Sequence, residues 1–112
     1  MLTIAIVLFA VAALGGLVLA SQALAGKTPP MAVAVIHGLF AASGLILLIM
    51  GVMKAATAGL GAWSLGIFLV AALGGFTLFS FHLRKRALPV PLVVVHALAA
   101  VTAFVMLLVW AL

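Results

Sequence analysis

Four long apolar runs dominate this 112-residue chain and leave few polar residues between them. The runs cover residues 2–25, 31–53, about 60–83 and 89–112, and short segments with proline, glycine or basic residues separate them. Each run is close to the roughly 20 residues that a helix needs to span a bilayer. Within hydrocarbon, only a helix satisfies every backbone polar group inside one segment. The sequence therefore predicts an all-α membrane protein with four transmembrane helices.

The composition excludes several classes of function. Hydrophobic residues make up 71% of the chain, and Asp, Glu and Cys are absent. Without these residues the chain has no carboxylate pair, no carboxylate proton carrier, no disulfide and no thiolate metal site. Five basic residues are too few for the broad phosphate contacts of a nucleic-acid surface. We therefore expect the lipid bilayer to be the main partner and nucleic acid not to be one.

The basic residues predict the orientation of the chain. The loops at 26–30 and 84–88 carry four of the five basic residues, and the opposite side carries only Lys54. By the positive-inside rule, these two loops are cytoplasmic and both termini lie outside. We expect the bacterial inner membrane as the location. The sequence Ala23-Leu24-Ala25 resembles a signal-peptidase site, but no basic residue precedes the apolar run, so a retained span is the expectation.

The chain contains an internal repeat. When residues 1–53 are laid on residues 60–112, 16 positions are identical, whereas a composition so biased would give about six. Each repeat contains two helices, so both copies cross the membrane in the same direction. The sequence thus predicts one transmembrane domain, 1–112, built as an antiparallel up-down bundle from two tandem repeats, with a pseudo-two-fold axis along the membrane normal.

His37 and His96 occupy the same position in the two repeats. Each lies seven residues beyond a matched proline, or roughly 10 Å along a helix, inside the hydrocarbon near the cytoplasmic face. A single intramembrane histidine is often a packed imidazole bonded to a carbonyl or hydroxyl. Two at one depth favour a functional pair. Neutral imidazole is a good ligand for iron in a porphyrin, so this pair is the candidate metal site.

Two glycine pairs, Gly15-Gly16 and Gly74-Gly75, are also matched between the repeats. Counted along the first and third helices, they lie close to the depth of the histidines. Close helix packing through small residues is the simpler explanation. Combined with two histidines at the same level, the glycines indicate room for a flat macrocycle.

This pattern resembles the haem-carrying four-helix bundle of membrane cytochromes b. In that family, glycines on the first and third helices face the haem edges and histidines on the second and fourth ligate the iron. The resemblance implies the same roles for the glycine pairs and for His37 and His96. The family's second histidine on each ligand helix has no counterpart here, so the resemblance implies a single haem b.

The cytoplasmic end of the third helix carries His82 beside a basic cluster that includes Arg84 and Arg86. Two interpretations stay open for His82: an amphipathic ring at the interface, or a group that receives the haem propionates or passes a proton to a bound quinone. The arginines are topology anchors that also suit propionates.

The leading expectation is a small b-type cytochrome that transfers electrons, rather than a stand-alone enzyme. Its electrons would come from quinol or from a partner redox subunit, with a homodimer or a larger complex as the assembly. One alternative is a small ion channel or transporter, since the stretch Gly74–Ser80 is similar to one in four-helix fluoride channels. However, the asparagine and early arginine of those channels are absent. The other alternative is a non-catalytic subunit of a larger complex.

Overall fold

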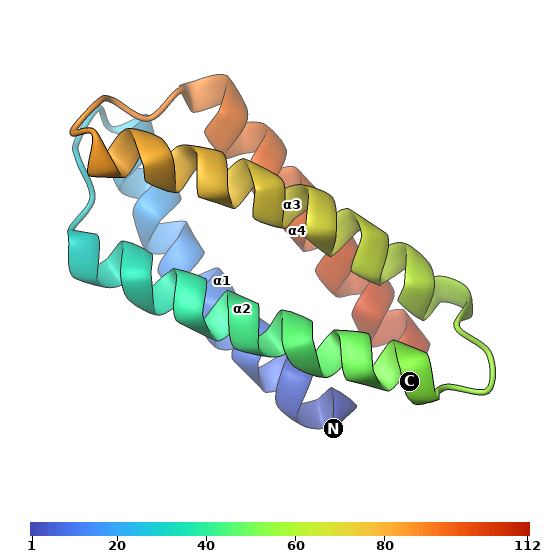
Figure 1. The fold of residues 1–112 in the computed structure, drawn as a ribbon. Coiled ribbons are helices and arrows are strands. Elements are labelled where there is room, and N and C mark those ends of the chain that lie inside the picture. The colour runs from blue at the N-terminus through green and yellow to red at the C-terminus, as the bar shows by residue number, and fades with distance from the viewer.

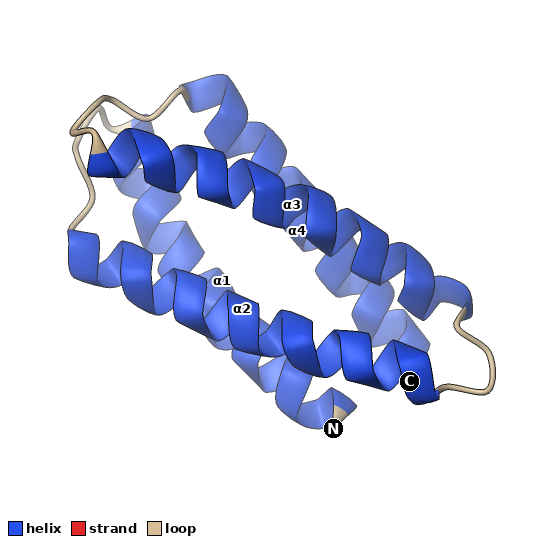
Figure 2. Ribbon diagram, viewed as in Figure 1, coloured by secondary structure: helices blue, strands red, loops and turns tan.

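The computed structural model describes all 112 residues and contains four α-helices joined by short segments (Figure 1). The helices are α1 (Leu2–Leu24), α2 (Met31–Lys54), α3 (Gly59–Leu83) and α4 (Val90–Ala111), with no strand (Figure 2). Each helix is long and apolar enough to cross a membrane. The predictions of an all-helical fold and of four candidate spans are confirmed, and the predicted helix ends differ from the observed ones by one residue or less.

Most apolar side chains lie on the outside of the structure. Only 15 of the 112 residues are buried, while large side chains such as Leu14, Val70 and Leu98 are exposed. In water such a surface would be a strong liability for aggregation. In a bilayer the same side chains contact hydrocarbon, so the exposure is the pattern that an integral membrane protein requires.

The helices associate as two hairpins. α1 packs along α2 and α3 packs along α4, whereas contacts between the two hairpins are fewer. The segments that join α1 to α2 and α3 to α4 lie together at one end, here called the loop end (Figure 1). Both termini and the α2–α3 connection lie at the opposite end, here called the terminal end (Figure 1).

A small buried core joins the hairpins in the half of the structure nearer the terminal end. The rings of Phe9 and Phe68, one from each hairpin, are stacked with centroids 4.0 Å apart and planes only 4° from parallel. Three residues from α2 and α4 complete this core: Leu48, Ala103 and Leu107. The hairpins are therefore held together mainly on one side of the bundle's midpoint.

At the terminal end, a large side chain of one helix packs against a glycine of its neighbour in each hairpin. The large residue is on the first helix of the first hairpin but on the second helix of the second hairpin. In the first hairpin, Leu2 of α1 lies against Gly51 of α2, where an added Cβ would be 2.8 Å from the Leu2 side chain. In the second hairpin, Trp110 of α4 lies against Gly61 of α3, where an added Cβ would be 2.5 Å from the indole. The large and small members have thus changed places between the two hairpins.

α1 and α3 end in the same backbone turn. At the end of α1, the Lys27 amide donates to the Gln22 carbonyl and Gly26 has a φ of 74°. At the end of α3, the Arg86 amide donates to the Phe81 carbonyl at 3.0 Å, and Lys85 has a φ of 54°. This Schellman turn needs one residue in the left-handed region, where glycine carries no Cβ penalty. Lys85 is the only non-glycine residue with a positive φ.

Replacing Lys85 with glycine is expected to raise the free energy of unfolding by about 1 kcal/mol, because the left-handed conformation is unfavourable for a residue with a Cβ. The matched control is Gly26→Ala, which should lower it by a similar amount. Unfolding by SDS, followed through helical circular dichroism in mixed micelles, measures both changes. A Lys85→Gly variant no more stable than the parent chain would contradict this account.

Candidate functional site

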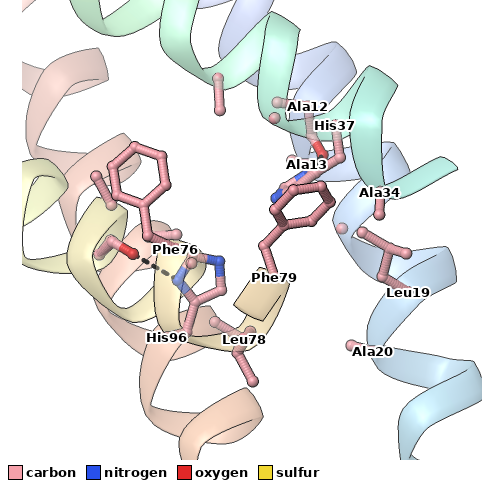
Figure 3. A pocket seen from close by; sticks show the side chains of 18 of the residues that line it. Ala12, Ala13, Leu19, Ala20, Ala34, His37, Phe76, Leu78, Phe79 and His96 are labelled. Atoms are coloured by element: carbon pink, nitrogen blue, oxygen red, sulfur yellow. Dashed lines mark hydrogen bonds between the residues drawn. The ribbon is translucent and has the colours of Figure 1, made fainter. Parts of the chain in front are cut away.

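The structure brings His37 of α2 and His96 of α4 together between the hairpins. Their ring centroids lie 6.3 Å apart, with the ring planes nearly perpendicular at 81°. Figure 3 shows both rings directed toward the space between the helices. An imidazole nitrogen binds a metal at roughly 2 Å, and roughly 1 Å separates that nitrogen from the ring centre, so rings sharing one metal have centroids about 6 Å apart. The observed separation matches this value.

Each histidine is held by a backbone carbonyl of the neighbouring helix. His37 Nδ1 lies 2.7 Å from the Ala12 carbonyl oxygen, and His96 Nδ1 lies 2.7 Å from that of Ala71; Figure 3 draws the second bond. A carbonyl only accepts hydrogen bonds, so Nδ1 must carry the proton and donate it. This arrangement leaves the Nε2 lone pair of each neutral imidazole available to a metal, and it fixes the orientation of the ring.

The matched glycines make this approach possible. An added Cβ at Gly16 would lie 3.1 Å from His37 Cε1, and one at Gly75 would lie 3.1 Å from His96 Cε1. Gly16 follows Ala12 by one helical turn, so the imidazole reaches the Ala12 carbonyl across the glycine surface. Gly75 stands in the same relation to Ala71.

Gly15 and Gly74 pack against the Cβ atoms of the same histidines, at 3.5 and 3.6 Å from an added Cβ. The sequence interpretation gave all four glycines a place at the edge of a macrocycle. The structure puts them against the imidazoles instead, with only Gly16 and Gly75 also lining the space between the hairpins. The close approach of helix and side chain, rather than free space, accounts for the glycine pairs.

A cavity of about 870 Å³ separates the hairpins and receives side chains from all four helices. Its volume falls within the roughly 300–1,000 Å³ typical of small-molecule and cofactor sites. The stacked Phe9 and Phe68 line it toward the terminal end. Three histidines, His37, His82 and His96, are the only polar side chains in the lining. The lining therefore suits a largely apolar group, and these imidazoles are the side chains that could bind a polar or metal centre within it.

The third histidine, His82, comes from the last turn of α3. It is buried, with 7% of its surface exposed, and its ring centroid lies 6.4 Å from that of Phe79. The corresponding residue of the first repeat, Ala23, also lines the cavity. The loop end of the cavity is therefore asymmetric, with an imidazole contributed by the second repeat and a methyl group by the first.

Arg84 and Arg86 do not line the cavity. The Arg84 guanidinium donates to the carbonyl and hydroxyl oxygens of Ser80, at 3.2 and 3.3 Å, and lies 4.9 Å from the centre of the Phe81 ring. Arg86 is exposed. Of the three residues proposed for propionates, the structure thus brings only His82 to the cavity.

The donor set limits the kind of metal group that fits. No cluster of three or more His, Cys, Asp or Glu side chains is present. Structural and catalytic zinc sites use at least three protein ligands, so two imidazoles do not make a site for a free ion of that kind. They do suffice for a metal whose other ligands come from a macrocycle, as in bis-histidine haem proteins.

Two contributors to this site were not singled out from the sequence: the carbonyls of Ala12 and Ala71. Alanine side chains give no functional signal, but each alanine precedes a matched glycine by four residues. Comparisons of this chain found no matching protein-family model, no similar curated protein and no similar solved structure.

Proposed function

We propose that this chain is a small integral-membrane b-type cytochrome that carries one haem between His37 and His96 and transfers single electrons. The observation that carries the proposal is the spacing of the two imidazoles, 6.3 Å between centroids, with each Nδ1 engaged by a backbone carbonyl. Both Nε2 lone pairs are then free for one metal centre. The size and the apolar lining of the cavity support a flat, largely hydrophobic group.

Haem supplies one-electron chemistry at its iron when bound. His37 and His96 would hold the iron through both imidazoles, which would favour electron transfer over oxygen chemistry. The Ala12 and Ala71 carbonyls orient the imidazoles and increase their basicity. At the loop end, His82 would donate a hydrogen bond to a propionate, a role supported by its position in the cavity lining. Arg84 and Arg86 of the neighbouring turn would contribute positive charge there.

The proposed architecture is an up-down bundle with a pseudo-two-fold axis along the membrane normal. Matched contacts support it. The His37–Ala12 hydrogen bond recurs as the His96–Ala71 hydrogen bond after a shift of 59 residues, and the stacked Phe9 and Phe68 are related by the same shift. The proposed orientation places the loop end in the cytoplasm and both termini outside, in a bacterial inner membrane. The bias of basic residues toward the loop end supports this orientation.

A channel for fluoride or another ion receives less support. A conducting pathway would have to continue from the cavity to the terminal end. The Phe9–Phe68 stack and the buried Leu48 and Leu107 occupy that half of the bundle. The buried polar side chain in that half, Ser64, donates its hydroxyl to the Ala103 carbonyl at 2.7 Å, so it does not offer a free group to a desolvated ion.

The test is an absorption spectrum of the purified protein in detergent, before and after reduction with dithionite. We expect an intense Soret band that sharpens on reduction, together with a narrow α-band, because two imidazoles give a low-spin iron. Expression with added haem precursor should give near one haem per chain by pyridine haemochrome assay. A colourless protein that also fails to take up haem in detergent would refute the proposal.

A further inference from the structure

The two turns at the loop end differ sharply in charge. The turn after α3 carries Arg84, Lys85 and Arg86, here called the basic turn. The matched turn after α1 carries Ala25, Gly26 and Lys27, so it has one basic residue where the basic turn has three. Because the chain has no Asp or Glu, none of these cations is neutralised by an acidic side chain of the protein. The turn of the second repeat is therefore more positively charged than the turn of the first repeat, and no acidic side chain balances this charge.

The conformation of Lys85 indicates that this charge has a use of its own. Lys85 holds the left-handed position of the turn, with a φ of 54°, where the first repeat has Gly26 with a φ of 74°. A lysine at this position costs stability that glycine would not. Membrane orientation does not demand it, since Arg84, Arg86 and Lys27 already bias the charge toward this end.

The basic turn closely follows a cavity-lining histidine in the sequence. His82, two residues before Arg84, lines the cavity and is buried, while Arg84, Lys85 and Arg86 are exposed. The hydrogen bonds of Arg84 to Ser80 and its contact with Phe81 keep its charge at the end of α3. At the terminal end, the Phe9–Phe68 stack separates the cavity from the surface, and Lys54 is the one basic residue.

We infer that the basic turn is the docking surface for a water-soluble, acidic protein that exchanges single electrons with the site. This inference rests on the proposed haem site and names its partner. Lipid covers the sides of the bundle, so a soluble partner reaches the cavity most directly at the loop end. Opposite charge orients such a partner and accelerates its approach. With haem held by His37 and His96, one electron would pass from the ferrous site to the oxidised partner, leaving the ferric site and the reduced partner, with no bond or proton transferred.

The charge of the docking surface is tested with labelled poly-L-glutamate as the probe. The full chain is placed in phosphatidylcholine nanodiscs, which expose both ends and carry no anionic headgroups, and probe binding is followed by fluorescence anisotropy. The triple variant Arg84→Gln, Lys85→Gln, Arg86→Gln should bind at least about tenfold more weakly than the parent chain. The control Lys54→Gln should bind as the parent does. Equal binding by the triple variant and the parent would overturn the inference and leave the basic turn as a membrane anchor.

Lys85→Gly provides a second test that loss of folding cannot mimic. It should make the protein more stable and yet weaken polyglutamate binding by about threefold, because it removes one charge and one strained residue together. A variant that binds the probe as well as the parent chain would show that Lys85 has no part in docking.

Electron transfer is tested by stopped-flow oxidation of the dithionite-reduced protein in the same nanodiscs. Each ferrous haem gives one electron to one ferricyanide, which becomes ferrocyanide. The rate should fall by about tenfold in the triple variant and with added salt, while oxidation by the cationic tris-phenanthroline complex of cobalt should not slow. Rates that do not depend on the basic turn would overturn the inference. A colourless protein that still binds polyglutamate would instead refute the haem site and the electron transfer, and would leave only a surface that binds acidic partners.

Discussion

Replacing His37 or His96 with alanine is expected to abolish the low-spin absorption spectrum. In the proposed site each imidazole would supply one of two bonds to the iron, and the other ring, 6.3 Å away between centroids, could not supply both. Haem that remains would be five-coordinate and high-spin, without a narrow α-band, and its affinity should fall by at least about tenfold. Haem stoichiometry and the reduced spectrum measure both effects.

The third histidine provides the control for this experiment. His82 lines the same cavity, but it lies at the end of α3, away from the paired rings. The His82→Ala variant reproduces the alanine of the first repeat at this position and should keep the narrow α-band. Added imidazole should restore a low-spin spectrum to His37→Ala or His96→Ala by filling the vacated axial position. A narrow α-band that survives in both alanine variants without imidazole would show that these histidines are not the ligands.

Adding a single methyl group at Gly75 is expected to weaken haem binding by about tenfold, although the residue makes no bond to the cofactor. A Cβ at Gly75 would lie 3.1 Å from His96 Cε1, so the ring would have to move by a few tenths of an ångström, which is expected to disturb its 2.7 Å hydrogen bond to the Ala71 carbonyl. The ring would then be misaligned with the metal. Gly16→Ala should have the same effect on His37.

Gly66→Ala is the matched control, because it lies in α3 as Gly75 does and an added Cβ there meets nothing within 4 Å. Alanine is a better helix former than glycine by about 1 kcal/mol, so this variant should be at least as stable as the parent and bind haem normally. Haem titration of the apoprotein in detergent compares the two variants. Equal affinity for Gly75→Ala and Gly66→Ala would show that the glycine does not position the histidine.

The fold was predictable from the sequence because the bilayer leaves little choice. An apolar run of sufficient length must be helical, and Pro29-Pro30, Lys54 and the basic turn mark where the runs stop. Helix ends could therefore be placed within one residue. The matched prolines, glycines and histidines of the repeat indicated which helices carry the candidate site.

The contacts inside the site were only partly accessible from the sequence. The hydrogen bonds of His37 and His96 depend on the rotation of each helix about its axis, which packing determines and composition does not. The hydrogen-bond partners of the Arg84 side chain were also unpredictable, because a long flexible side chain can reach several nearby acceptors; in the structure it donates to Ser80. For His82, the sequence left open an interfacial ring or a group that serves the cofactor, and only the structure shows that it is buried and lines the cavity.

The exchange of large and small residues at the terminal end has a consequence for assembly. A chain made of two similar hairpins risks pairing a helix with the wrong copy of its neighbour, a common failure in repeat proteins. If α1 packed on α4 in place of α2, Leu2 would meet Trp110 and the two would collide. If α3 packed on α2, Gly61 would face Gly51 and leave a void. Each of these helix ends thus packs well only against the other helix of its own hairpin, which disfavours incorrect helix pairing between the two similar repeats.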